Sequence, residues 1–125
     1  MNIISKQDAV TLNAALSLDA NGSEQDWDIE FADPDRLHEF IEYYQSPDLS
    51  NSMRQALMAL IIASFDKALQ YSCFSDSDWS ELCNLLKCTP RGLHYDVLQY
   101  WAQPHGNDDD VFLITPKIRA LILDL

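Results

Sequence analysis

Residues 53–69, MRQALMALIIASFDKAL, contain the longest periodic apolar pattern of the chain. Apolar side chains recur there at steps of three or four residues, which is the spacing of one face of an α-helix. Most of the remaining positions are also apolar, among them Met58 and Ile62. Because a helix that is apolar on several sides has to be covered by other elements, residues 53–69 predict a central, buried helix.

Start signals for further helices lie on both sides of this segment. Ser5, followed by Asp8, indicates an N-cap, and Ser75 or Ser77 can cap a later helix. A capping residue followed by proline is a second signal, since proline at the first helical position lacks an N–H that would have no partner there. This signal occurs at Asp33-Pro34, Thr89-Pro90 and Thr115-Pro116. The helices expected from these signals contain the apolar residues of segments 9–16, 37–44, 79–86, 93–101 and 118–125.

Residues 26–31 have a different pattern. Trp27, Ile29 and Phe31 alternate with three acids, which is typical of a half-buried strand with its acidic side toward water. The extended run 111–114 is the candidate partner strand. The sequence therefore predicts a mainly α fold. Residues 1–125 would form a single-domain bundle of five or six helices, with a small two-stranded β ribbon if the two extended segments pair.

The overall charge limits the classes of partner. The chain has 125 residues, with 20 acidic and 8 basic side chains and a formal net charge of -12. Such a charge repels phosphate backbones and anionic lipid, so we expect neither nucleic acid nor a membrane as a direct partner. The longest apolar run, residues 56–63, is far shorter than the roughly 20 residues of a membrane-spanning helix, and no signal-peptide pattern begins the chain. We therefore expect a cytoplasmic protein.

The acids are unevenly distributed along the chain. Ten of them lie between residues 19 and 48, where Arg36 is the sole Lys or Arg, so ten negative charges and one positive give a local charge of -9. A solvated face usually mixes acids with lysines, so we predict an anionic recognition surface, with a merely solubilising face as the alternative. The candidate partner-binding residues, which include a second acidic run, are Asp26, Asp28, Glu30, Asp35, Glu39, Glu42, Tyr43, Asp108, Asp109 and Asp110.

No group of residues in the sequence indicates catalysis or a bound cofactor. The segment that begins at Asp76 resembles the start of a calcium loop, but it lacks the glycine and the final acid that such a loop requires. Cys73, Cys83 and Cys88 lack the close pairing of zinc ligands, and no glycine-flanked nucleophile or phosphate-binding loop occurs. We therefore expect no enzyme activity, no metal site and no cofactor, and we expect the cysteines to be reduced and mostly buried.

Four segments resemble a known class of proteins. They are residues 32–44, residues 53–66, Tyr100-Trp101 and Ile114-Thr115-Pro116. In these segments the chain resembles small acidic bacterial proteins of the toxin-immunity kind, which include the immunity proteins of contact-dependent inhibition and other polymorphic toxin systems. The similar residues are packing and capping motifs, so the resemblance indicates a class of protein without naming its partner.

The resemblance implies that the chain binds and neutralises a cognate bacterial toxin. A nuclease is the expected kind of toxin, because its groove for phosphate is basic and carboxylates can occupy it. Trp27, Tyr43 and Tyr44 are the candidate apolar anchors, although core packing is the commoner role for each. The alternative, from a different class, is a regulatory or adaptor domain that binds another cytosolic protein through the exposed edge of the strand at residues 26–31.

Overall fold

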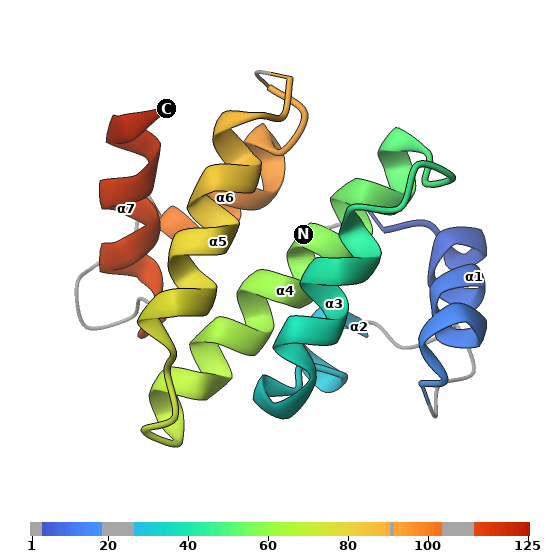
Figure 1. Ribbon diagram of the computed structural model, residues 1–125, viewed down its shortest axis with the longest axis horizontal. Helices are drawn as coiled ribbons and strands as arrows, with labels where there is room; N and C mark the ends of the chain where they lie inside the picture. The colour runs from blue at the N-terminus through green and yellow to red at the C-terminus, as the bar shows by residue number, and fades with distance from the viewer. Residues whose placement is uncertain (1–3, 19–26, 91, 104–111) are drawn as a thin grey trace.

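The computed structural model describes residues 4–18, 27–90, 92–103 and 112–125, and all regular structure in these ranges is helical (Figure 1). The predicted mainly α fold is thus confirmed. The expected number of five or six helices is not, because the described residues form seven α-helices and one short 3-10 helix. In chain order the elements are α1 (Lys6–Leu16), α2 (Trp27–Glu30), the 3-10 helix η1 (Pro34–Arg36), α3 (Leu37–Tyr44), α4 (Asn51–Gln70), α5 (Asp76–Lys87), α6 (Tyr95–Ala102) and α7 (Thr115–Asp124).

Helix α4 is the longest element and runs through the middle of the bundle (Figure 1). Ser50 caps its first turn, and the Ser50 Oγ accepts the backbone N–H of Met53 at 3.2 Å. Every residue from 56 to 66 is buried, because α1, α2, α3 and α6 all pack against α4. The predicted central helix is therefore confirmed. Neither α4 nor any other helix in the described ranges is long and apolar enough to cross a membrane.

Each of the other five predicted helical segments also contains a helix. The side chains of three predicted caps accept a backbone N–H from the first turn, at Ser5, Asp33 and Ser75. One boundary differs from the prediction, because α6 begins at Tyr95 and not directly after Thr89-Pro90. Gly92 has a φ of +90°, a backbone conformation that no α-helix contains, and residues 92–94 form turns instead.

The predicted strand at residues 26–31 is wrong. Residues 27–30 form helix α2, and the backbone N–H of Phe31 closes its turn by donating to the carbonyl of Trp27 at 3.1 Å. Trp27 is buried whereas Ile29 is 41% exposed, so the alternating apolar residues do not share one face. An apolar alternation this short fits one helical turn equally well. Residues 112–114 form no strand either, and Asp26 and Val111 lie outside the described residues.

Three arginines hold the carboxyl ends of helices. Arg36, Arg54 and Arg119 donate hydrogen bonds to backbone carbonyls at or just after the ends of α1, α3 and α6, respectively. The last carbonyls of a helix have no partner within it, and a cation also complements the negative end of the helix dipole. The guanidinium groups of these arginines therefore stabilise helix ends within the fold.

The expected burial of the cysteines is wrong for two of them. All three are free thiols. Cys83 is half-buried within α5, and burial raises the pKa of its thiol. Cys73 and Cys88 are exposed, because each follows the end of a helix where the apolar pattern has stopped.

Candidate functional site

The predicted recognition acids occupy unequal environments. Asp28 is only 6% exposed, so the prediction that its carboxylate faces water is wrong. Asp28 follows Trp27 in the short turn of α2, which packs against α4. Four of the predicted acids are exposed, namely Glu30, Asp35, Glu39 and Glu42. Asp26, Asp108, Asp109 and Asp110 lie outside the described residues.

The three candidate aromatic anchors also differ in burial. Trp27 is 3% exposed, and its indole N–H donates to Asn13 Oδ1 at 2.7 Å. Tyr44 is likewise 3% exposed and belongs to the core. Tyr43 is half-buried at the edge of the core, so of the three it alone is partly exposed on α3.

The exposed side of α3 contains two polar pairs in different states. Glu39 accepts hydrogen bonds from Arg36 at 3.0 and 2.6 Å, and this contact lowers the pKa of the Glu39 carboxyl. Its charge is therefore already compensated. One residue earlier, His38 Nε2 lies 3.7 Å from Glu42 Oε1, one helical turn away. Among the described residues, the ion-pair partner of Glu42 is therefore an imidazole and not a Lys or Arg.

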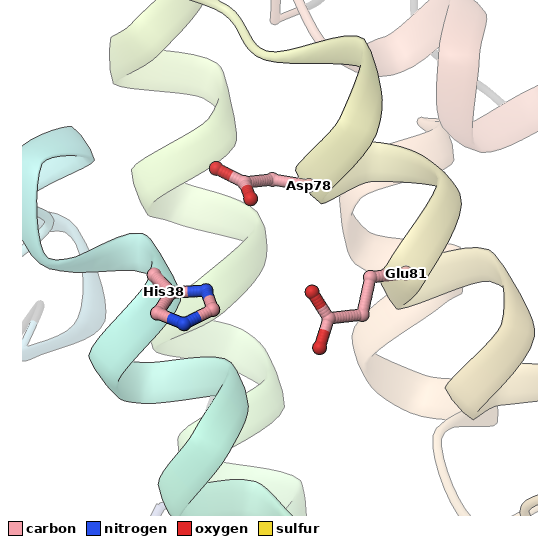
Figure 2. Close-up of side chains that lie close together, drawn as sticks. All are labelled: His38, Asp78 and Glu81. Atoms are coloured by element: carbon pink, nitrogen blue, oxygen red, sulfur yellow. The ribbon is translucent and has the colours of Figure 1, made fainter.

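Helix α5 brings two further carboxylates to the second pair. Asp78 and Glu81 lie one turn apart on α5 and point toward His38 on α3 (Figure 2). One ligand atom from each of these three side chains lies within 4.8 Å of the other two. Ser75 fixes the start of α5, since its Oγ accepts the N–H of Asp78 at 3.2 Å. Two packed helices therefore bring one imidazole and two carboxylates to a single point.

Among the described residues, these carboxylates have no ion pair with a strong cation. In the described part of the chain, no Lys or Arg forms an ion pair with Glu42, Asp78 or Glu81. The three arginines described above are bound to helix ends, and Lys67 donates to the carbonyl of Ala32 at 3.2 Å. We call Glu42, Asp78 and Glu81 the α3–α5 acidic face.

The sequence prediction included Glu42 but missed His38, Asp78 and Glu81 as members of one site. Local signals were present, because His38 and Glu42 are four residues apart and Asp78 and Glu81 are three apart, so each pair shares a helix face. Whether those two faces meet depends on how α3 and α5 pack together. Nothing in the spacing along the chain gives that packing.

A separate cavity of about 390 Å³ lies among α5, α6 and α7. Leu86, Leu98 and Ile122 contribute apolar walls, and Lys87 and Asp124 contribute charged side chains of opposite sign. The cavity is large enough for a small organic molecule. His94 also lines the cavity and is the imidazole among its described lining residues.

His94 is held as a neutral, structural side chain. It is 4% exposed, and its Nε2 lies 2.5 Å from Tyr44 Oη, while Nδ1 has no hydrogen-bond partner within the described ranges. Burial, and secondarily the charge of Arg54, lowers the pKa of His94 to about 4. An imidazole with that pKa is an inefficient general base near pH 7, because the proton it accepts is held too weakly. The cavity therefore gives weaker grounds for a function than the α3–α5 acidic face.

Comparison with known proteins gives no relative of this chain. No family model matches it, and no curated protein and no solved structure is significantly similar to it. The resemblance to toxin-immunity proteins stays a prediction from the sequence.

Proposed function

We propose that this protein is a non-catalytic binding protein whose α3–α5 acidic face recognises a basic surface on a partner protein. The observation that supports this most strongly is the meeting of Asp78 and Glu81 of α5 with His38 of α3, which also lies beside Glu42, with no Lys or Arg ion pair to these three acids in the described residues. Like charges held together raise the electrostatic energy of the free protein, and a partner's cations lower it. The net charge of -12 adds long-range attraction for the same kind of partner.

The resemblance noted in the sequence makes a bacterial protein toxin the proposed partner, and this protein its immunity protein. A nuclease toxin suits an acidic inhibitor, because the groove that binds phosphate is basic and can accept carboxylates instead. Tyr43 is the remaining aromatic anchor, since it is half-buried and adjoins Glu42 on α3. A regulatory or adaptor domain that binds another cytosolic protein is the second candidate, but a strand edge at residues 26–31 is not its binding surface, because residues 27–30 are helical.

The test compares two triple variants with the same change in net charge. Glu42→Gln, Asp78→Asn and Glu81→Gln together neutralise the α3–α5 acidic face. Asp8→Asn, Asp48→Asn and Asp96→Asn neutralise three acids on other elements. Each protein is co-expressed with the product of the neighbouring gene, with cell survival and co-purification as the readouts. The association rate is then measured over a range of salt concentrations.

We expect the face variant to associate about tenfold more slowly or worse and to lose most of its salt dependence, because charges at the edge of an interface act mainly on the association rate. The association rate of the control variant should fall less, since this variant keeps the α3–α5 acidic face. An equal fall of the association rate in both variants would mean that the net charge alone, and not the position of the acids, determines association. Full protection by the face variant would contradict the proposed surface, and a harmless neighbouring product would contradict the toxin as partner.

A further inference from the structure

The contact of α3 with α5 places metal-binding donors of two kinds together. His38 supplies an imidazole nitrogen, and Asp78 and Glu81 supply carboxylate oxygens, with one atom of each within 4.8 Å of the other two (Figure 2). Zn²⁺ binds such atoms at about 2.0–2.2 Å, so the donors of a tetrahedral site lie roughly 3.4 Å apart. His38 is exposed and the two acids are half-buried. Small rotations of partly exposed side chains can therefore close the remaining distance.

The combination of donors selects a class of ion. Ca²⁺ and Mg²⁺ prefer sites made wholly of oxygen, whereas imidazole nitrogen combined with carboxylate suits divalent first-row transition metals. The arrangement also leaves open coordination positions for water, because the donors that converge within the described ranges number three. A nearby carboxylate commonly orients the histidine of such sites, and Glu42 is placed for this, with its Oε1 3.7 Å from His38 Nε2.

The charges around the cluster favour a cation as well. Asp78, Glu81 and Glu42 have no ion pair with a Lys or Arg of the described chain. An ion of charge +2 placed between Asp78 and Glu81 removes their mutual repulsion. It also connects α3 directly to α5, which are separate helices at neighbouring positions in the bundle (Figure 1).

We propose that His38, Asp78 and Glu81 form a binding site for a divalent first-row transition-metal ion, of which Zn²⁺ is the probe chosen here. The ion bridges α3 and α5, and Glu42 positions the imidazole. This inference does not rest on the proposed function, because it concerns the purified chain without a partner. The two are linked in one respect. A bound ion neutralises two of the three carboxylates of the α3–α5 acidic face and so competes with a basic partner.

The test is a calorimetric titration of the purified protein with ZnCl₂, repeated with MnCl₂ and MgCl₂ and accompanied by thermal melts. We expect one saturable Zn²⁺ site per chain, a weaker response to Mg²⁺, and a rise in Tm on the order of 5–10 °C when free Zn²⁺ is about 100 times its Kd. His38→Ala and Glu81→Gln should each weaken Zn²⁺ binding by at least roughly tenfold to 100-fold, because that loss is already typical when a residue that merely supports a ligand is removed.

Two controls exclude other sources of binding. Glu39→Gln changes a neighbouring acid on α3 that already pairs with Arg36, so it should leave the Zn²⁺ affinity within about twofold of the unmodified chain. Cys73→Ser combined with Cys88→Ser removes the exposed thiols, which can also bind Zn²⁺. Helical circular dichroism spectra confirm that each variant is folded. The proposal is overturned if no saturable Zn²⁺ binding occurs or if His38→Ala binds Zn²⁺ as tightly as the unmodified chain. It is also overturned if Zn²⁺ affinity is lost in the Glu39→Gln variant or in the variant without the exposed thiols.

Discussion

The two sides of α3 contrast sharply although they belong to the same eight residues. On the side toward α4, Phe40 and Ile41 are fully buried and join the apolar core. On the side toward α5, His38 and Glu42 are exposed, and His38 lies close to the carboxylates of Asp78 and Glu81. The first side gains stability by removing apolar surface from water, whereas the second holds charges that nothing in the described fold neutralises.

The difference shows how the polar side is positioned. Burial of the apolar stripe fixes the rotation of α3 about its own axis, and the helix period of 3.6 residues then directs His38 and Glu42 to the opposite side. The polar residues need not stabilise α3 in order to be placed accurately. Changes on the two sides should therefore have very different consequences for stability.

The largest expected effect is on the buried side. Phe40→Ala should lower the free energy of unfolding by about 3–5 kcal/mol, because it removes a large, fully buried ring and leaves a cavity against α4. Chemical denaturation followed by circular dichroism measures this difference. A loss below about 1 kcal/mol would show that the buried side of α3 does not determine its position.

An intermediate effect is expected at the end of α3, where Tyr44 contacts His94. The pKa of His94 is lowered from 6.5 to about 4, so the unfolded chain binds a proton at a higher pH than the folded chain does. The contribution of neutral His94 to the free energy of unfolding is fully present above pH 6.5 and is lost as the pH falls from 6.5 to about 4. Stability should drop by up to about 3 kcal/mol over this window, since one pKa unit corresponds to roughly 1.4 kcal/mol.

The matched control for the acid effect is His94→Gln, which keeps a polar side chain but cannot bind a proton in this range. Denaturation curves between pH 7 and pH 4 should fall more steeply for the unmodified protein than for the variant, because the carboxyl groups titrate in both. Parallel curves would contradict the assignment of the effect to His94.

The smallest effect is expected on the polar side. Glu81→Gln without metal should change the free energy of unfolding by no more than about 0.5 kcal/mol, as partly exposed changes usually do. The sign should be stabilising, because the substitution reduces repulsion from Asp78, and added salt should diminish the gain. A marked loss of stability in denaturation experiments at low salt would show that Glu81 has a structural role. The buried and polar sides of α3 would then not differ in their contribution to stability.

Much of the core could be predicted from the sequence because helical signals act locally. The apolar period of residues 53–69 and the cap at Ser50 define α4 with little help from the rest of the chain. Residues 27–30 could not be predicted in the same way. Their conformation follows from contacts with distant residues, such as the hydrogen bond from Trp27 to Asn13, which outweigh a short alternation of apolar side chains.

The candidate site was predictable only in part. The excess of acids at residues 19–48 drew attention to Glu42, but the same argument included Asp28, which is buried. Charge counts along a chain ignore which side of a turn each residue occupies. Asp78 and Glu81 lie outside that acidic segment, and only the packing of α3 against α5 unites them with His38.

The arginines at the helix ends have a consequence for how such a sequence can change over generations. Arg36, Arg54 and Arg119 bind backbone carbonyls, whose positions depend on the course of the chain and hardly at all on the identity of neighbouring side chains. The outward acids, by contrast, are not needed to complete any helix end. A lineage can therefore exchange Asp35, Glu42 or Glu81 without rebuilding the scaffold beneath them, and under the proposed function such exchanges would alter the choice of partner.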